Sequence, residues 1–371
     1  MYLKSIDIKN FRNYDHLSIE LNKGINIIYG KNAQGKTNLL ESIYFLALTK
    51  SHRSFIDDNL IKNEKDMATI SGKMICNRIP KNLEIHLSKN KTLLIDKKKI
   101  TKVSDYISKM NVIIFYPEDL DIIKGSPNQR RKFLNLELCQ LYSNYYVILN
   151  EFNKLLKMRN DYLKKISLNH SYDKNYLEIL NNYFVDKGIY LFQMRKKFVE
   201  KLNECAPIIY KNITGNENFY IKYITNINLE QDKESIKKEF LDTLSKNFER
   251  EVKLKSTIIG PHRDDIEFYL NNENIKNYGS QGQQRVTVLA VKLGEIEIFK
   301  KYKETNPILL LDDIFSELDT RKKNNLLRYI KKSVQTIITT TDLNQINKKI
   351  IEKSKLIQIE NGQIKKIEEV I

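Results

Sequence analysis

The sequence has little of several things that mark common protein classes. It contains three cysteines, Cys76, Cys139 and Cys205, and this odd, widely spaced set excludes a disulfide framework and shows no metal-ligand spacing. No apolar run approaches the ~20 residues that a membrane-spanning helix requires. The first residues carry charges and lack a long apolar core, so we expect no signal peptide. These absences favour a reducing, cytoplasmic location.

Patterns typical of nucleophilic catalysis and of base reading in DNA are also missing. No Ser-His-Asp or Cys-His arrangement is supported, and there is no helix-turn-helix or zinc-finger signature. Acidic residues are the scarcer charge, and the formal net charge is +17 over 371 residues. A basic surplus favours polyanionic partners, either nucleic acid or anionic lipid, although a lysine-rich surface on a chain of biased composition is the alternative. The length allows a large core or two domains.

The strongest motif present is a phosphate-binding loop of the pattern G-x-x-x-x-G-K-[ST]. Its positions are filled by Gly30, Lys31, Asn32, Ala33, Gln34, Gly35, Lys36 and Thr37. An apolar run over 25–29 leads into the loop and a helical pattern over 38–43 leads out, which is the strand–loop–helix context that the motif needs. The loop N–H groups and the helix start would hold the phosphates of ATP. We expect Lys36 to reach the β and γ phosphates and the Thr37 hydroxyl to ligate Mg²⁺.

A second motif, residues 307–313, is a continuous apolar run that ends in two carboxylates. Such a run predicts a central parallel strand covered on both faces, and its carboxyl end is where open α/β sheets bind ligands. We expect Asp312 to hold Mg²⁺, directly or through water, and Asp313 to polarise the attacking water. Lys36 and Asp313 are thus the predicted catalytic residues.

A third motif is the turn Ser280-Gln281-Gly282-Gln283, which opens a helical pattern. A serine cap, free N–H groups and a positive helix end make it a second anion site. One chain does not need two γ-phosphate cradles for one ATP. We therefore expect Ser280, Gly282 and Gln283 to cover the ATP of a second copy in a head-to-tail homodimer.

A long stretch separates the first two motifs, which indicates an insertion. Apolar residues recur in steps of mostly three and four from Leu134 to Tyr162, interrupted by Arg159, and a second helical run from Leu177 closes before Pro207. Two such runs around a polar break predict an antiparallel helical hairpin. The expected domains are residues 1–120, the N-terminal half of an ATPase head; 121–250, a mainly helical arm; and 251–371, the C-terminal half of the head.

With these motifs the chain resembles the RecF family of DNA replication and repair proteins, which are ABC-type ATPase heads of the SMC class. The resemblance is carried by Tyr2–Ile6, Asn10–Tyr14, Gly30–Thr37, Lys50–Arg53, Phe115–Leu120, Lys124–Pro127, Arg130–Arg131, Gly260–Asp265, Ser280–Arg285 and Leu309–Asp319. It implies an α/β fold, an ABC-type P-loop head with an inserted α-helical hairpin arm. It also implies an ATP-driven dimer that binds DNA near single-strand gaps in recombinational repair. The implied partners are DNA, RecR and RecO, with RecA loaded indirectly.

Two positions depart from the wider ABC pattern. Gln281 stands where the usual signature has glycine, and Thr341 stands where many heads have a switch histidine, which suggests slow hydrolysis. Two alternatives are a nuclease-coupled ATPase of the overcoming-lysogenisation type and a nucleotide-gated scaffold with little turnover. The stretch after Asp342 is short for a nuclease domain, and the complete set of phosphate and Mg²⁺ residues argues against a dead site.

Several smaller features keep two interpretations each. Arg53 is predicted to touch a phosphate or adenine, or to lie in a solvated turn. The segment 260–265 is a dimer contact or a structural ion-pair turn. The basic triplet 130–132 is a solvated helix face or a contact to DNA phosphates. Residues 316–319 resemble the D-loop of ABC heads, which crosses the dimer interface.

Overall fold

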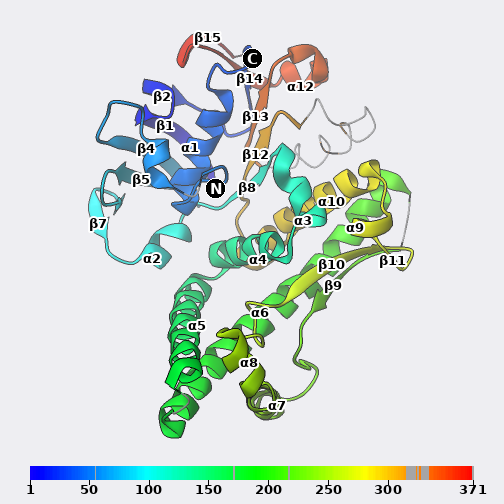
Figure 1. Cartoon of the computed structure of the whole chain (residues 1–371). Coiled ribbons are helices and arrows are strands. Elements are labelled where there is room, and N and C mark those ends of the chain that lie inside the picture. The colour runs from blue at the N-terminus through cyan, green and yellow to red at the C-terminus, as the bar shows by residue number, and fades with distance from the viewer. Residues whose placement is uncertain are drawn as a thin grey trace. The chain divides into compact units, whose positions relative to one another are not determined.

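The structure, a computed structural model, describes residues 1–54, 56–169, 172–215, 218–314, 323, 326 and 334–369. Within these residues the chain forms two compact units (Figure 1). Unit 1 comprises Met1–Asp119, Ile208–Gly215 and Val288–Ile371, and unit 2 comprises Leu120–Pro207 and Asn216–Thr287. The domain limits expected near residues 120 and 250 stay predictions. In the helices that are described, no stretch combines the length and the apolar character that crossing a bilayer demands.

Unit 1 contains an antiparallel sheet whose strands alternate in burial. Its order is β2-β1-β4-β5-β6-β7, formed by Tyr14–Glu20, Tyr2–Phe11, Ala68–Cys76, Ile79–Leu87, Thr92–Ile95 and Lys98–Ile100. In β2 the buried positions recur every second or third residue, as expected when one face packs inward. Strands β5 and β6 form an antiparallel hairpin, in which Ile85 pairs with Leu93.

The second sheet of unit 1 carries the motif strands. Its order is β15-β14-β3-β13-β12-β8, formed by Gln363–Glu369, Ser354–Glu360, Ile25–Tyr29, Thr336–Thr340, Ile308–Asp312 and Val112–Phe115. The five strands from β14 to β8 are parallel to one another, and only β15 is antiparallel. Every residue of β12 is buried, so the predicted central parallel strand is confirmed.

Helix α1, Lys36–Leu48, follows β3 directly and contacts strands of both sheets of unit 1. Of its residues, all but Thr37 and Asn38 are buried. A helix that is covered on nearly every side needs apolar residues all round, and this explains why its sequence shows no clear polar face. Among the residues that the structure describes, this unit also has the short helices η1 Asp57–Leu60, α2 Val103–Ile107, η4 Leu343–Gln345 and α12 Lys348–Ile351, and most of η2 Pro117–Leu120.

Unit 2 is mainly helical. Six of its described helices lie wholly within it: α3 Asp121–Lys124, α4 Pro127–Leu141, α5 Ser143–Asn169, α7 Lys233–Lys246, α8 Phe248–Leu254 and α9 Ile275–Tyr278. It also contains most of α6 Lys174–Thr214 and the start of α10 Gln281–Lys303. A small antiparallel sheet has the order β11-β10-β9, formed by Glu273–Asn274, Asp265–Leu270 and Phe219–Ile224. Helices α5 and α6 form the predicted hairpin. Phe152 stacks on Phe184 and Tyr162 meets Tyr176, so the pairing runs antiparallel.

Two sequence expectations about the hairpin change in the structure. Helix α6 continues through Pro207 to Thr214, so the predicted end before Pro207 is wrong. A proline inside a helix loses one backbone hydrogen bond, but the flanking Ala206, Ile209 and Tyr210 are buried, and this burial offsets the loss. Arg159, which interrupts the apolar seam of α5, is completely buried and donates hydrogen bonds to Glu251 and Thr257.

Candidate nucleotide-binding site

The phosphate loop leaves β3 and enters α1 through two glycines that no other residue can replace without strain. Gly30 has φ 155°, and a Cβ built there would lie 2.3 Å from the carbonyl oxygen of Ile359. Gly35 has φ 108°, and its Cβ would lie 2.8 Å from the side-chain nitrogen of Asn13. Both positions therefore require glycine, for backbone conformation and for space. Between them Ala33 also has a left-handed φ of 62°.

Segments far away in the sequence brace this loop. The Tyr14 hydroxyl donates a buried 2.8 Å hydrogen bond to the Gly35 carbonyl oxygen. From the turn between β14 and β15, the Asn361 N–H donates to the side-chain oxygen of Gln34 at 2.5 Å and the Gly362 N–H donates to its carbonyl at 3.1 Å. The loop is thus held from two sides, which pre-orders its backbone for a ligand.

Lys36 lies across the loop with its ammonium on two carbonyls. The Nζ atom donates to Gly30 O at 2.8 Å and to Lys31 O at 2.7 Å. Burial lowers the pKa of Lys36, and the charges of Asp313 and Asp312 oppose that shift. Among the described residues no side chain caps the N-terminus of α1. Its first N–H groups therefore face the loop as an anion site, with the positive end of the helix dipole behind them.

Thr37 and Asp312 meet beside the loop. The Thr37 hydroxyl donates to Asp312 Oδ1 at 2.9 Å, and Thr339, on the neighbouring strand β13, donates to the same oxygen at 2.7 Å. Burial raises the pKa of Asp312, and these two hydrogen bonds act in the opposite direction. A hydroxyl and a carboxylate side by side are the oxygen ligands that Mg²⁺ prefers next to phosphates. The pair fits a Mg²⁺ ion bound together with a nucleotide.

Asp313 is the next residue, but its backbone is different. It has a left-handed φ of 50°, and its N–H donates to the Thr339 hydroxyl at 3.1 Å. A non-glycine residue in this region is uncommon and is often found at functional sites. The extended backbone of β12 therefore ends at Asp312, directly before this residue. Thr339 contacts both residues and was not predicted from the sequence.

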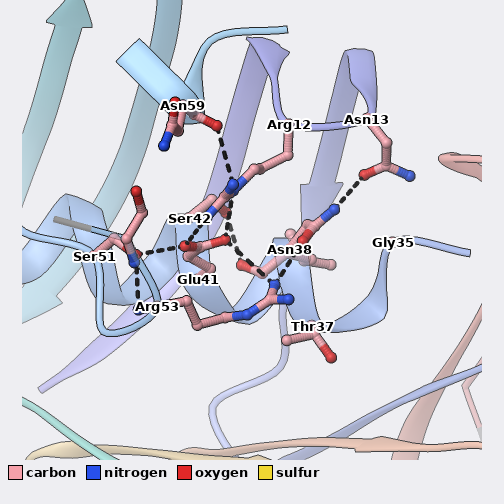
Figure 2. Close-up of polar contacts among 12 residues, drawn as sticks. Arg12, Asn13, Gly35, Thr37, Asn38, Glu41, Ser42, Ser51, Arg53 and Asn59 are labelled. Carbon is pink, nitrogen blue, oxygen red and sulfur yellow. Dashed lines mark hydrogen bonds and ion pairs between the residues drawn. The ribbon is translucent and has the colours of Figure 1, made fainter. Parts of the chain in front are cut away.

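A network of polar side chains lies next to the loop on α1 (Figure 2). Its centre is the Glu41 carboxylate, which accepts hydrogen bonds from the Nε and Nη2 atoms of Arg12 at 2.9 and 2.7 Å. The Ser51 hydroxyl donates to Glu41 at 2.5 Å. Arg53 donates to the Asn38 side chain at 3.0 Å and lies 3.6 Å from Glu41. The solvated-turn interpretation of Arg53 is therefore incomplete, because the side chain is tied to the first turns of α1.

The third predicted motif belongs to unit 2. Ser280 and Gln283 form a reciprocal cap: the Gln283 N–H donates to the Ser280 hydroxyl at 3.3 Å, and the Ser280 N–H donates to the Gln283 side chain at 2.7 Å. Ser280 is exposed, and Gly282 lies in the first turn of α10. The predicted serine cap is present, whereas contact of Ser280, Gly282 and Gln283 with a partner's nucleotide stays a prediction.

The segment 260–265 lies within unit 2 and forms ion pairs with residues of that unit. Asp264 is buried and forms a 2.5 Å ion pair with Arg195, while Asp265 accepts two hydrogen bonds from Arg130. Arg131 donates to the carbonyl oxygen of Asp264 at 2.7 Å. Burial raises the pKa of Asp264, and Arg195 opposes this shift. The ion-pair turn is therefore present and engages two members of the basic triplet, Arg130 and Arg131, whereas contact of this segment with a second copy stays a prediction.

The structure thus brings the loop residues 30–37, Asp312 and Asp313 together within unit 1. The D-loop segment 316–319 lies outside the described residues. The sequence did not predict Glu41 as the centre of the polar network on α1. It also did not predict the hydrogen bonds of Tyr14 to the phosphate loop and of Thr339 to Asp312. Thr339 had one usable signal, because a threonine near the carboxyl end of a buried strand lies beside the motif strand when the two are neighbours.

These features define the class of the protein: a P-loop nucleotide-binding domain, with the phosphate loop after one parallel strand and the carboxylates at the end of another. Comparisons with known proteins agree. The family model described as RecF/RecN/SMC N terminal domain matches residues 2–366. The chain is 40% identical to the DNA replication and repair protein RecF of Pediococcus pentosaceus over 98% of each chain. It is 42% identical to RecF of Streptococcus suis over 98% of this chain and 99% of the relative.

Solved structures give the same result. A structure titled as the recombination mediator protein RecF-ATP in the RecFOR pathway superposes with a TM-score of 0.91 at 30% identity, over 99% of this chain and 98% of that one. An Smc head domain from Pyrococcus furiosus, 16% identical, shares the fold with a TM-score of 0.54 over 99% of this chain and 96% of that one. The chain belongs to the RecF family of DNA replication and repair proteins. The predicted fold, an ABC-type head with a helical hairpin arm, is confirmed.

Proposed function

We propose that this protein is an ATP-dependent DNA-binding protein of recombinational repair and replication, which closes as a head-to-tail dimer on ATP and opens on hydrolysis. The observation that carries the proposal is the joined set of phosphate loop, Thr37, Asp312 and Asp313 in unit 1. Relatives named DNA replication and repair protein RecF, and the similar solved structure of RecF with ATP, support the proposal.

Each residue of the set has a distinct task. The loop N–H groups and Lys36 bind phosphates, and the ammonium exchanges its two carbonyl partners for phosphate oxygens. Thr37 and Asp312 would hold Mg²⁺, which neutralises phosphate charge. Asp313 orients and polarises a water for attack at the γ-phosphate. Because the hydroxyl and carboxylate are already in contact, little reorganisation is needed when the nucleotide binds.

The dimer rests on the turn at the start of α10. Ser280 is exposed at the N-terminus of a long helix, and its side chain caps that terminus rather than filling a pocket of its own. We infer that in the dimer Ser280, Gly282 and Gln283 cover the γ-phosphate held by the partner's loop. ATP then joins the two copies, and ADP does not.

DNA is the proposed polyanionic partner. The formal charge of +17 supports binding to the phosphate backbone without base reading. Two copies joined by ATP would present one larger basic footprint and gain avidity. The similar solved structures are of the recombination mediator protein RecF in the RecFOR pathway, which supports RecR and RecO as partners, with assistance to RecA loading downstream.

The alternative is a nucleotide-gated scaffold with little turnover, favoured by Thr341 in place of the switch histidine. Both the proposed function and this alternative require ATP binding, so a binding measurement distinguishes them from a protein that uses no nucleotide. We expect saturable binding of a fluorescent ATP analogue, lost in Lys36→Met and retained in Lys4→Gln, which changes an exposed lysine of unit 1 outside the loop. Undiminished binding by Lys36→Met would contradict the proposal.

A further inference from the structure

Glu41 is a completely buried carboxylate on α1, one helical turn after Thr37. Burying a carboxylate is costly unless it is paired and hydrogen-bonded. Here Arg12 donates two hydrogen bonds and Ser51 donates one (Figure 2). Burial raises the pKa of Glu41, but the hydrogen bonds from Arg12 and Ser51 outweigh it and the net pKa is lowered. The site therefore holds a fixed anion next to the phosphate loop.

The anion orders the segment that follows α1. The Ser51 hydroxyl donates to Glu41 and accepts from the N–H groups of Arg53 and Ser54, both at 2.9 Å. The ring of His52 is packed between Tyr44 and Tyr116, with ring centroids 5.0 and 4.9 Å apart. The backbone of 51–54 is thus fixed on two sides, so the direction of the Arg53 side chain is restricted.

Arg53 extends from this fixed turn toward the nucleotide site. Its Nη1 donates to the side chain of Asn38, the residue after Thr37. Its charge also acts on the buried Asp312, so the guanidinium and the Mg²⁺ carboxylate share one neighbourhood. The Arg53 side chain is 43% exposed, whereas Glu41 behind it is fully buried. A guanidinium has five N–H donors in a planar fork, which leaves donors available for phosphate oxygens.

We propose that Glu41 is a positioning residue, which holds Arg12 and the turn 51–54 so that Arg53 is presented to the phosphates of the bound nucleotide. The inference rests on the proposed function, because it assumes that the loop binds ATP. It adds to that function a residue that touches no ligand itself. Its effect passes through two arginines and one serine, each within hydrogen-bond or ion-pair distance of Glu41.

Positioning by Glu41 and a purely electrostatic role predict opposite effects of neutralising Glu41 on ATP affinity. A buried negative charge near an anion site repels phosphates, so neutralising it should strengthen ATP binding if geometry did not matter. Glu41→Gln keeps the size of the side chain but weakens its hold on Arg12 and replaces an acceptor by a donor facing the guanidinium. If Glu41 positions Arg53, the same substitution weakens ATP binding, by about tenfold for one lost charge-assisted contact.

The test is equilibrium binding of a fluorescent ATP analogue with Mg²⁺ by wild type, Glu41→Gln, Arg53→Gln and the double variant. We expect each single variant to bind about tenfold more weakly and the double variant to bind no more weakly than Arg53→Gln. Tighter or unchanged binding by Glu41→Gln, or losses that add in the double variant, would overturn the positioning role. Wild-type protein that binds no ATP would overturn the proposed function instead, so the two failures are distinguishable.

A matched control separates positioning from general destabilisation. Glu251→Gln removes the charge of another fully buried carboxylate that pairs with an arginine, Arg159, at 2.7 Å in unit 2. We expect the midpoint temperature of thermal unfolding to fall at least as much in Glu251→Gln as in Glu41→Gln, whereas the ATP affinity of Glu251→Gln should be unchanged. Equal affinity losses in the two variants would assign the Glu41 effect to stability and overturn the proposal.

Discussion

Asp312 and Asp313 are adjacent in sequence and have different surroundings. Asp312 is buried and accepts hydrogen bonds from Thr37 and Thr339. Asp313 follows with a left-handed φ of 50° at the end of the strand. In the proposed function Asp312 holds Mg²⁺ and Asp313 orients the attacking water, so the two carboxylates have separate tasks. At the scale of single residues, binding and hydrolysis should be separable.

We predict that Asp313→Asn keeps ATP-stabilised dimerisation and DNA binding but loses hydrolysis, by a factor of about 10² to 10⁴ as for removal of a general base. Lys36→Met should lose all three, because in the proposed function Lys36 contacts phosphates in both the ground state and the transition state. Sedimentation with ATP and a phosphate-release assay measure these effects. An Asp313→Asn protein that stays monomeric with ATP would contradict the separation.

His52 gives a pH dependence of stability. Its ring is packed between two tyrosines, and burial lowers the pKa of His52 from 6.5 to about 4. Below pH 6.5 the unfolded chain binds a proton that the folded state excludes. The contribution of neutral His52 to the free energy of unfolding is therefore fully present above pH 6.5 and is lost as the pH falls toward 4. At pH 5 this loss amounts to about 2 kcal/mol.

In wild type, the free energy of unfolding should fall between pH 7.5 and pH 5, in part because His52 titrates. We expect this fall to be smaller by ~2 kcal/mol in His52→Phe, which keeps an aromatic ring between the two tyrosines. His262→Phe should act in the same direction, because burial also lowers the pKa of His262 to about 4. Urea unfolding at the two pH values measures the difference. A fall that is the same in His52→Phe and wild type would show that His52 is not buried in neutral form.

At the scale of elements, the N-terminus of α10 combines a local and a proposed role. Ser280 caps the helix, and loss of such a cap costs about 1 kcal/mol. We predict that Ser280→Arg leaves the ATP affinity of the monomer nearly unchanged but abolishes dimerisation and hydrolysis, because bulk and charge would separate the two copies. Binding of a fluorescent ATP analogue, compared with light scattering, tests this. Equal loss of ATP affinity would place Ser280 in its own chain's pocket.

The ion-pair turn 260–265 is the second element with a clear prediction. Asp264→Asn leaves Arg195 buried without its counter-charge, so unfolding free energy should fall by about 3–5 kcal/mol. Arg263→Gln changes an exposed residue of the same turn and should stay within about 0.5 kcal/mol of wild type. Urea denaturation of both variants decides it. Similar stability of the two would mean that the buried pair does not hold the turn.

Elements with a strong local pattern were predictable from the sequence. The phosphate loop, the apolar strand ending in Asp312 and the helical hairpin each follow from spacing within a short window. The path of α6 through Pro207 was not, because a proline predicts a helix end and only burial of its neighbours overrides it. Arg159 likewise looked like a break in a seam until its distant partner Glu251 was known.

The supports of the site were not predictable for a related reason. Tyr14, Glu41 and the turn at Asn361 act on the loop or beside it through contacts between segments far apart in the chain. Periodicities and motifs report only on residues that are close in the sequence, whereas these contacts form only when the sheets of unit 1 bring distant segments together. The chemistry of the site could therefore be predicted, but not the groups that hold it in place.

At the scale of the whole molecule, the formal charge of +17 is the feature that the proposed function must use. If the charge binds DNA phosphates, affinity falls with salt by ~0.9 log units per log unit of salt for each phosphate contacted. Only a dimer joins two basic surfaces, so the slope should steepen when ATP joins the copies. A surface that is merely lysine-rich would give the same slope in every nucleotide state.

The most direct test is sedimentation of the protein with labelled duplexes of unrelated sequence, in ATP or ADP, across a salt series. We predict a DNA-bound dimer in ATP with a steep salt slope and little sequence preference, and a weakly bound monomer with a shallow slope in ADP. Asp313→Asn in ATP should retain the dimeric complex. Identical oligomeric states and identical slopes in ATP and ADP would contradict the account of an ATP-driven DNA-binding head.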